Sequence, residues 1–470
     1  MKRIKACIGL FLLANTIASA KVILPAVIDH NMVLQQKTNA ALWGKARPAA
    51  KVKITTSWNG RSYTAQAGSD SLWRVSVSTP AAGGPFSITF DDGEKLVLKN
   101  ILIGEVWVCS GQSNMSMPVK GFRNQPIEGS NDLLMNAKNS KLRLFQVTRQ
   151  VSDQAQFDTK ARRWEEADIE GVGEMSAVGY LFAKIIQEKL DVPVGIVLTA
   201  WGGTRIEAWM SPSALQAFPS VKIPAPGDSV KLNQNSATAL YNSMISPIAG
   251  FTIKGVLWYQ GEANRRNYSE YPQMMQSMVA DWRKRWNCGE WPFYYVQIAP
   301  YKYENDKKSA YLREAQLQAL KLIPNSAMAV TADIGKELSI HPPDKMTVGK
   351  RLAYCALARD YGGAQLPYRG PVYRSMKITA DTVDLAFDHA PNGLYAGEKD
   401  LTLFEIAGED KIFHPATAKI TQAGIRVWSG QVKNPAAVRY AFKDWFTGEL
   451  FNTEGLPASP FRTDNWEASK

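Results

Sequence analysis

The chain is poor in the side chains that bind metal ions through nitrogen or sulfur: its 470 residues contain only four histidines and four cysteines. The cysteines, at positions 7, 109, 288 and 355, show none of the paired spacings that are typical of zinc sites. The histidines stand at positions 30, 341, 389 and 414. We therefore expect neither a metal nor a cofactor, and a reaction that needs an imidazole has few candidates.

Long hydrophobic runs are absent after the first 20 residues. Within those 20 residues, Lys2, Arg3 and Lys5 precede the apolar stretch IGLFLLA, and the small residues ASA end at Ala20. This order is typical of a cleavable secretory signal peptide. No later run is long enough to predict a membrane span. We expect a secreted or periplasmic protein whose mature chain begins near Lys21.

Blocks of like charge are also absent, although the formal net charge is +12. Lysine and arginine are scattered among acidic residues, a pattern typical of solvated surface rather than of a nucleic-acid-binding face. We therefore expect no nucleic-acid partner, and the sequence leaves the oligomeric state open.

The pattern of strands and helices changes twice after the predicted signal peptide. Residues 21–102 contain short alternating segments broken by Gly, Pro, Asn and Asp, which predict a β module. Residues 103–365 alternate apolar strands with amphipathic helices, which predicts an α/β domain with a parallel sheet and helices on both faces. Short strands return in residues 366–470, a second β-rich, sandwich-like region. Whether the two β regions form one module stays open.

Polar groups follow four of the five predicted strands of the middle region. Ser113 follows EVWVC, the segment 201–204 (WGGT) follows VGIVLTA, the segment 260–262 (QGE) follows GVLWY, and Asp333 follows AMAVTA. In open α/β sheets, ligands bind at the carboxyl ends of the strands. We therefore expect these groups to share one cleft.

A nucleophilic serine needs a base, and His341 is the only histidine of the middle region. It lies in a proline-containing loop just before a helix predicted to begin near Met346. A histidine there can reach a serine on another loop and accept its proton. The alternative is a purely structural histidine that caps the following helix. If His341 is the base, activity is expected to fall on the acid side at a pH of roughly 6 to 7.

Four segments together resemble the sialate O-acetylesterases of the SGNH hydrolase superfamily: GQSNM, WGGTRIEAW, WYQGEAN and IHPPDKMTVGKRLA. The segments LPAVIDHNMVLQQ near the start and GLPASPFRTDNW near the end also resemble that family, so the likeness covers nearly all of the predicted mature chain. The resemblance implies an SGNH-like sheet and a serine esterase that removes O-acetyl groups from sialic acids. The implied substrate is an O-acetylated sialic acid or another acetylated glycan.

The same resemblance implies roles for individual residues. Ser113 matches the family's nucleophile and His341 its general base. The oxyanion hole would consist of the backbone N–H of Ser113, the backbone N–H of Gly203 and the side chain of Gln260. By its own chemistry, and not from the resemblance, Arg205 is a candidate to bind the carboxylate of a sialic acid, because a guanidinium fork suits a carboxylate; alternatively, it pairs with Glu207 or a neighbouring acid.

The sequence departs from the superfamily pattern at the acid that orients the histidine. Many members carry an aspartate three residues before it, and here that position is Leu338. Glu262 and Asp333 are the two candidates for this role, and a backbone carbonyl, which would leave a Ser-His dyad, is a third.

Three other functions fit parts of the sequence. The first is an acetylxylan esterase or another polysaccharide deacetylase, because related sequences share the serine and histidine motifs. The second is a non-catalytic carbohydrate-binding protein, which would not require Ser113 and His341. The third is a glycosidase that uses Glu262 and Asp333 as a carboxylate pair.

Overall fold

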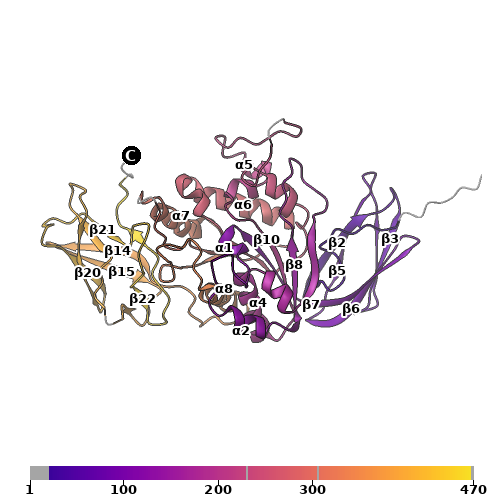
Figure 1. Ribbon diagram of the computed structural model, residues 1–470, viewed down its shortest axis with the longest axis horizontal. Helices are drawn as coiled ribbons and strands as arrows, with labels where there is room; N and C mark the ends of the chain where they lie inside the picture. The colour runs from indigo at the N-terminus through magenta and orange to yellow at the C-terminus, as the bar shows by residue number, and fades with distance from the viewer. Residues whose placement is uncertain (1–20, 229–230, 304–305, 398, 467–470) are drawn as a thin grey trace, which may run out of the picture.

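The computed structural model describes residues 21–228, 231–303, 306–397 and 399–466. The predicted signal peptide, residues 1–20, lies outside this part of the chain. Figure 1 shows a central α/β region flanked by N-terminal strands at one end and C-terminal strands at the other. The two β regions therefore do not form one module.

The N-terminal strands have the two-residue periodicity that the sequence predicts. In β3, for example, Val52 and Ile54 are buried while Lys51 and Lys53 are exposed. β2 pairs with β5, and β3 pairs with β4 and β6, all antiparallel. The bounds are β1 Val33–Gln35, β2 Asn39–Lys45, β3 Lys51–Thr56, β4 Ser62–Gln66, β5 Leu72–Ser78 and β6 Gly83–Asp91.

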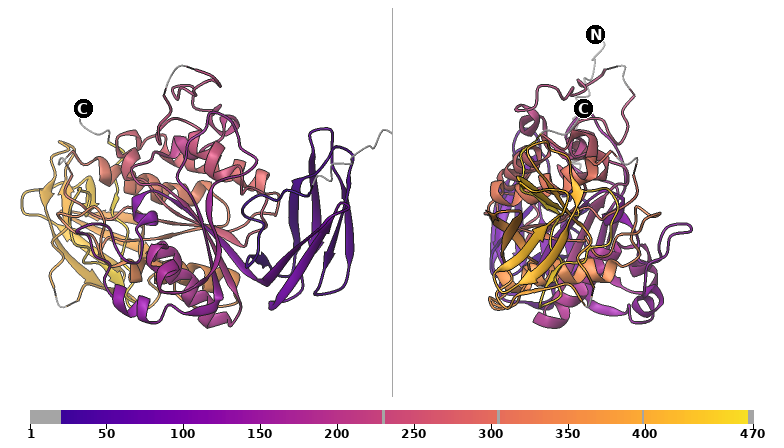
Figure 2. Two further views of the ribbon diagram at one scale, coloured as in Figure 1. Left: turned by 45° about the vertical axis from the view of Figure 1, so that its right-hand side comes forward. Right: turned by 90° about the vertical axis from the view of Figure 1, so that its left-hand side faces the viewer.

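One long strand, β7 (Lys95–Gly111), joins the N-terminal strands to the central sheet. Its first part pairs antiparallel with β6, and its second part pairs parallel with β10 and β11. The turned views of Figure 2 let the reader follow this strand from the N-terminal region into the centre. The boundary that the sequence predicts between residues 102 and 103 falls inside β7.

The central sheet has the order β13-β12-β11-β7-β10-β8-β9, and all of these strands except β9 run parallel. β8 and β9 were not among the predicted strands, because charged residues such as Lys141 and Arg143 interrupt the apolar pattern of β8. The bounds are β8 Asn139–Val147, β9 Ala161–Ala167, β10 Val194–Ala200, β11 Gly255–Tyr259, β12 Phe293–Val296 and β13 Ser326–Ala329.

Helices cover both faces of this sheet, which confirms the predicted fold class (Figure 1). Alternate residues of β7 enter different hydrophobic clusters: Val106 and Val108 pack on the side of α6, and Trp107 and Cys109 on the side of α4 and α8. The bounds are α1 Ser113–Ser116, α2 Ser130–Met135, α3 Ile169–Glu174, α4 Ala177–Leu190, α5 Pro212–Leu215, α6 Tyr271–Trp286, α7 Lys308–Leu322 and α8 Lys345–Asp360.

The C-terminal strands form two antiparallel four-stranded sheets, β14-β15-β20-β19 and β18-β17-β21-β23, and a small pair, β16-β22. Their hydrophobic cluster includes Ala332 of the central region, so the C-terminal sheets pack against the segment that leads to His341. The bounds are β14 Val372–Thr379, β15 Thr382–Asp388, β16 Leu394–Tyr395, β17 Phe404–Ala407, β18 His414–Pro415, β19 Thr417–Thr421, β20 Gly424–Trp428, β21 Ala437–Tyr440, β22 Phe451–Asn452 and β23 Phe461–Arg462.

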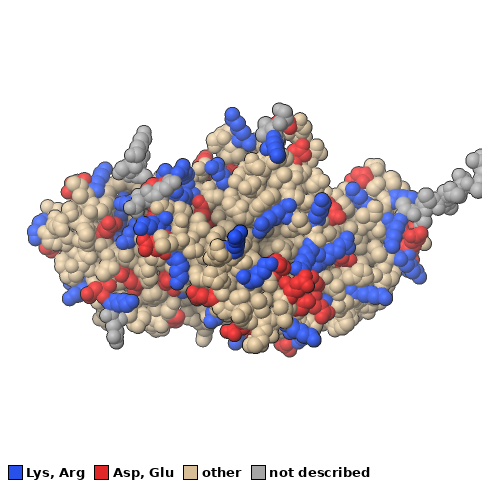
Figure 3. Space-filling model, in the orientation of Figure 1, with Lys and Arg blue, Asp and Glu red and all other residues tan. Residues whose placement is uncertain are grey.

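On the face shown in Figure 3, lysine and arginine side chains are interspersed with acidic ones. Within the described residues, no helix combines the length and hydrophobicity that a bilayer crossing requires. Cys109, Cys288 and Cys355 are free thiols, and Cys109 is buried in the core as its place in β7 predicts.

Candidate active site

Three neighbouring strands end at the same edge of the central sheet. β7 lies between β10 and β11, and Gly111 at its end is in register with Ala200 on one side and Tyr259 on the other. The loops that begin at residues 112, 201 and 260 therefore leave the sheet side by side. The structure thus brings together three of the four polar segments that the sequence predicted to share a cleft.

Ser113 stands at the start of α1, directly after a tight turn at Gly111. Gly111 has a φ of 131°, and a Cβ atom there would lie 2.2 Å from the Tyr259 carbonyl oxygen. The Gln112 N–H donates to that same carbonyl at 2.9 Å. This close approach requires a glycine and turns the chain so that Ser113 is partly exposed while Asn114 is buried.

The WGGT segment passes directly beside Ser113. A Cβ atom on Gly202 would lie 3.2 Å from the Ser113 Cβ. The Trp201 N–H donates to the Gly111 carbonyl at 3.0 Å, which fixes the start of the segment. Gly203 follows with a φ of 70° and is exposed. The structure therefore places the predicted oxyanion donor Gly203 one residue beyond the backbone that contacts Ser113.

Gln260 is fully buried, and its side chain has its hydrogen-bonding groups occupied. Its Nε2 donates to the Thr204 carbonyl at 3.0 Å and to Asn264 Oδ1 at 2.7 Å. Its Oε1 accepts from the Tyr271 hydroxyl at 2.7 Å. Gln260 would have to release one of its two donated hydrogen bonds to reach an oxyanion, and its predicted role as a donor stays a prediction.

His341 is half-buried, and its ring is held from the loop that follows α1. Its Nδ1 lies 2.6 Å from Gln125 Oε1, and the ring packs edge-to-face against Phe122 at 5.4 Å between centroids. Asn114 Nδ2 donates to the Ile340 carbonyl at 3.1 Å, so the residues next to Ser113 and His341 contact each other. No hydrogen bond joins these two side chains, both within the described chain, and such catalytic bonds are often long in unliganded enzymes.

Glu262 hydrogen-bonds to Asn114 rather than to His341. Its Oε1 accepts from Asn114 Nδ2 at 2.6 Å, and Asn114 Oδ1 in turn accepts from Lys345 Nζ at 2.6 Å. All three residues are buried. Burial raises the pKa of Glu262, against the opposing effects of its hydrogen bonds and of Lys345. Burial also lowers the pKa of Lys345 to about 7.

Asp333 is paired with an arginine of α8. Both of its carboxylate oxygens accept from Arg351, each at 2.7 Å. This bidentate pair occupies both oxygens of Asp333. No hydrogen bond joins Asp333 to His341, both of which the structure describes. The orienting roles predicted for Glu262 and Asp333 stay predictions.

Arg205 projects from the WGGTRIE segment into solvent. Among the described residues, its guanidinium has no hydrogen-bond or ion-pair partner, while its backbone N–H donates to Asn235 Oδ1 at 2.8 Å. Glu207 is buried and accepts from Asn264 Nδ2 at 2.9 Å. The alternative pairing of Arg205 with Glu207 is therefore not formed, and the cation of Arg205 is free to meet an anion.

Three residues of the site were not predicted: Asn114, Gln125 and Lys345. Asn114 and Lys345 lie inside the motifs GQSNM and IHPPDKMTVGKRLA, and a lysine at the start of a largely apolar helix face was a signal that could have been used. Gln125 lies in an irregular loop, FRNQP, that carries no periodic or motif signal.

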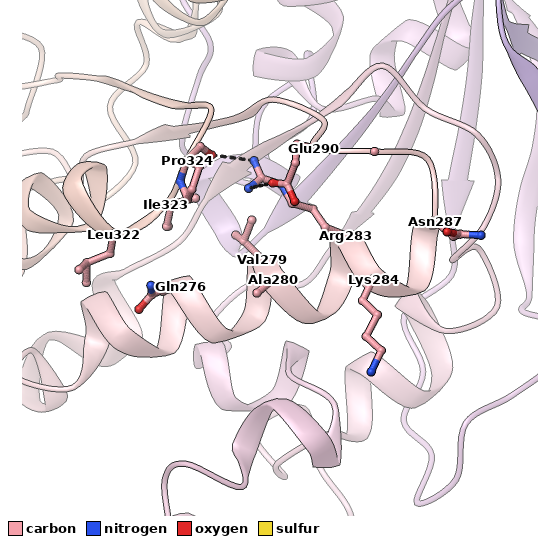
Figure 4. Close-up of a pocket in the computed structure, with 11 residues that line it drawn as sticks. Gln276, Val279, Ala280, Arg283, Lys284, Asn287, Glu290, Leu322, Ile323 and Pro324 are labelled. Carbon is pink, nitrogen blue, oxygen red and sulfur yellow. Dashed lines mark hydrogen bonds and ion pairs between the residues drawn. The ribbon is translucent and has the colours of Figure 1, made fainter.

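A separate pocket lies beside α6, away from these residues (Figure 4). Arg283 crosses it, with an ion pair to Glu290 at 2.7 Å and a hydrogen bond to the Pro324 carbonyl at 2.8 Å. None of the predicted site residues lines this pocket.

Comparison with known proteins identifies the family of the chain. The family described as "carbohydrate esterase, sialic acid-specific acetylesterase" matches residues 103–358, more than half of the chain. The chain belongs to this family. The resemblance drawn from the motifs is thereby confirmed, and so is the enzyme class of carboxylic-ester hydrolase.

Individual relatives cover most of the chain. A sialate O-acetylesterase of Rattus norvegicus is 29% identical, over 92% of this chain and 93% of its own. A sialate O-acetylesterase of Homo sapiens is 32% identical, over 81% of this chain and 79% of its own. The crystal structure of a carbohydrate acetylesterase from Xanthomonas citri superposes with a TM-score of 0.86 at 35% identity, and covers 95% of this chain and 100% of its own.

The turn at Gly111 yields a first prediction for this esterase. Gly111→Ala is expected to lower the free energy of unfolding by at least about 4 kcal/mol, because both the backbone conformation and the contact with the Tyr259 carbonyl oppose a Cβ atom. Gly60→Ala is the matched control: Gly60 also has a positive φ, 67°, but nothing lies within 4 Å of the place that a Cβ atom would occupy there. That variant should cost only about 1–2 kcal/mol. Urea unfolding of both variants measures the difference, and equal costs would contradict the proposed role of the close approach.

The surroundings of His341 yield a second prediction, which differs from the sequence-based expectation. Burial, and then the positive charge of Lys345, lower the pKa of His341 to about 4. Both effects disfavour the protonated imidazole, so the neutral base persists as the pH falls towards that value. We expect kcat/KM to fall on the acid side near pH 4. Initial rates measured in overlapping buffers give kcat/KM at each pH, and the thermal midpoint at each pH shows that the protein is still folded. A complete loss of kcat/KM already at pH 5.5, in protein that is still folded, would contradict this prediction.

Proposed function

We propose that this esterase removes O-acetyl groups from sialic acids through an acetyl-enzyme intermediate on Ser113. The observation that supports this most directly is the position of Ser113. It lies on a glycine turn at the edge of the sheet, beside the WGGT backbone, and its neighbour Asn114 contacts the segment of His341. Relatives named sialate O-acetylesterases align with most of the chain.

In the first half of the reaction, His341 Nε2 accepts the proton of the Ser113 hydroxyl while its oxygen attacks the acetyl carbonyl carbon. Negative charge develops on the carbonyl oxygen, and the backbone N–H groups of Ser113 and Gly203 are suited to stabilise it. The C–O bond to the sugar then breaks, and His341 returns the proton to the departing sugar oxygen. The products of this half are the deacetylated sugar and acetyl-Ser113.

In the second half, water replaces the sugar. His341 accepts a proton from the water as the water oxygen attacks the acetyl carbonyl, and the same N–H groups face the oxyanion. The bond to Ser113 breaks and the proton returns to its oxygen, which releases acetate. No step needs a redox partner or a metal, because proton transfer and hydrogen bonding to the oxyanion account for every bond change.

An exposed arginine next to the WGGT segment supports a sugar acid as substrate. Arg205 directly follows the WGGT segment and is exposed, and its guanidinium has no partner among the described residues. A guanidinium fork binds a carboxylate with two parallel hydrogen bonds. A sialic acid presents such a carboxylate, whereas the neutral sugars of acetylated xylan do not. We also propose secretion or periplasmic export, on the pattern of residues 1–20.

The test of this function is acetate release from three substrates: O-acetylated sialic acid, acetylated xylan and an aryl acetate. Ser113→Ala is expected to lower kcat by about a million-fold on each, since removal of the nucleophile leaves only binding and oxyanion stabilisation. An organophosphorus reagent should add mass to the peptide that contains Ser113. Release of reducing sugar without acetate would indicate a glycosidase, and a preference for xylan would indicate a polysaccharide deacetylase. No turnover on any substrate would indicate a binding protein.

Substrate choice gives a further prediction at Arg205. Arg205→Met should raise KM for O-acetylated sialic acid by roughly tenfold to a hundredfold, as expected for the loss of a charge-assisted hydrogen bond. KM for the uncharged aryl acetate should stay the same. Arg61→Met, at an exposed arginine between β3 and β4, is the control and should change neither constant. An equal rise for both substrates in Arg205→Met would argue against carboxylate binding.

A further inference from the structure

The imidazole of His341 has a neutral partner at the position where a catalytic triad has an acid. Gln125 Oε1 lies 2.6 Å from Nδ1. The two carboxylates that the sequence offered are bound to other groups: Glu262 to Asn114, and Asp333 to Arg351. The group that faces Nδ1 is therefore an amide oxygen, which can accept a hydrogen bond but carries no charge.

Gln125 is held in place by a closed turn. The Phe122 N–H donates to the Gln125 carbonyl at 3.0 Å, and the Gln125 N–H donates to the Phe122 carbonyl at 3.0 Å. Gly121, with a φ of 79°, precedes this turn, and a Cβ atom there would lie 2.4 Å from the Gln125 carbonyl oxygen. Asn124 at the tip has a φ of 61°. The backbone of the turn is thus tightly defined, which limits where the Gln125 side chain can reach.

Both ends of this turn contact the same ring. Phe122 packs edge-to-face against the imidazole at 5.4 Å, while Gln125 meets its Nδ1. A few residues further on, the Glu128 N–H donates to the Pro343 carbonyl at 3.0 Å. Residues 121–128, which we call the histidine-holding loop, therefore contact both His341 and the chain just after it.

We propose that Gln125 is a positioning residue: its amide oxygen accepts the Nδ1–H of His341, fixes that tautomer and directs Nε2 towards Ser113. This inference rests on the proposed Ser-His function of the site. The amide takes over the orienting part of the role of a triad acid, because it holds the tautomer and the ring plane. It does not take over the charge-stabilising part, because it has no negative charge to place against an imidazolium.

The charged groups around His341 allow this division of roles to be tested. Phe122 and Gln125 from the histidine-holding loop are neutral, and Lys345 from α8 is the charge that acts on the ring. The Asp344 carboxylate accepts from the backbone N–H and hydroxyl of Thr347. A carboxylate placed at position 125 would therefore be the first acid in hydrogen-bond contact with Nδ1.

Two substitutions at position 125 separate orientation from charge. Gln125→Met keeps the length of the side chain and removes the acceptor, so kcat should fall by about tenfold to a hundredfold, the effect of one lost hydrogen bond. KM for the aryl acetate and the thermal midpoint should stay unchanged. Gln125→Glu keeps the acceptor and adds charge, so activity near neutral pH should be retained while the acid-side loss of kcat/KM moves up by at least about one pH unit.

A spectroscopic measurement tests the inference without turnover. With ¹⁵N-labelled histidine in the Ser113→Ala protein, the signals of the four histidines of the chain are few enough to assign by substitution. His341 should appear as the Nδ1–H tautomer, Gln125→Met should convert it to a mixture of tautomers, and Gln125→Glu should raise its pKa. Glu262→Gln is the comparison and should leave the tautomer unchanged.

The outcomes distinguish the two proposals. If no acetylated substrate is turned over but the Nδ1–H tautomer depends on Gln125, the proposed function fails and the positioning role stands. If the esterase is active but Gln125→Met changes neither kcat nor the tautomer, the positioning role is overturned. Loss of the tautomer in Glu262→Gln but not in Gln125→Met would assign the role to Glu262 instead.

Discussion

The side chain of Asn114 is the contact on which the geometry of this site depends. Its Nδ2 donates to Glu262 and to the Ile340 carbonyl, and its Oδ1 accepts from Lys345. One buried amide thus uses both donor hydrogens and its acceptor to join three segments: the turn that carries Ser113, the loop after β11, and the loop of His341 with α8. The amide dipole is oriented to suit both charged groups, because its oxygen faces the amine of Lys345 and its nitrogen faces the carboxylate of Glu262. Without it, the buried side chains of Glu262 and Lys345 would lose this hydrogen-bond partner, which is costly because both are shielded from water.

The outer regions of the molecule contribute to the same site through the backbone. β7 carries the chain from the N-terminal strands to Gly111, so the turn that leads to Ser113 begins on a strand that is paired along its length. The C-terminal region acts on the histidine loop: the Gly448 N–H donates to the Ala332 carbonyl at 2.9 Å. The neighbouring segment is also bound, because the Tyr301 N–H donates to the Asp444 carbonyl at 3.2 Å and Lys302 pairs with Glu337. The C-terminal region therefore helps to fix the segment that leads to His341.

The sequence predicts the parallel sheet, the edge where Ser113 lies and the family, because each depends on local pattern. Buried strands appear in the sequence as apolar runs. A glycine directly after such a run indicates a turn in which the backbone passes close to the neighbouring strand. The partner of His341 could not be predicted in this way. Gln125 lies 216 positions before His341 in an irregular loop. Because its amide is neutral, it adds no charged residue to the sequence pattern that could mark it as a partner. Glu262 and Asp333 were the obvious acids by position, but Asn114 and Arg351 bind them in the folded chain. Which of several polar groups meets the ring is decided by packing, which sequence spacing does not encode.

The neutral partner of His341 Nδ1 has a consequence for where transition-state stabilisation must come from in the proposed mechanism. As the proposed base, His341 with a pKa near 4 is neutral at almost any pH and ready to accept a proton, but it would hold that proton weakly. In a triad with a carboxylate, the acid stabilises the imidazolium as it forms. Here an amide faces Nδ1 and Lys345 opposes the positive charge, so that stabilisation is small. More of the barrier must then be lowered at the other end of the reacting system, by donors already aimed at the oxyanion. The rigid glycine turn at Gly111 and the WGGT backbone held against Ser113 are the features of this fold that can supply such preorganisation.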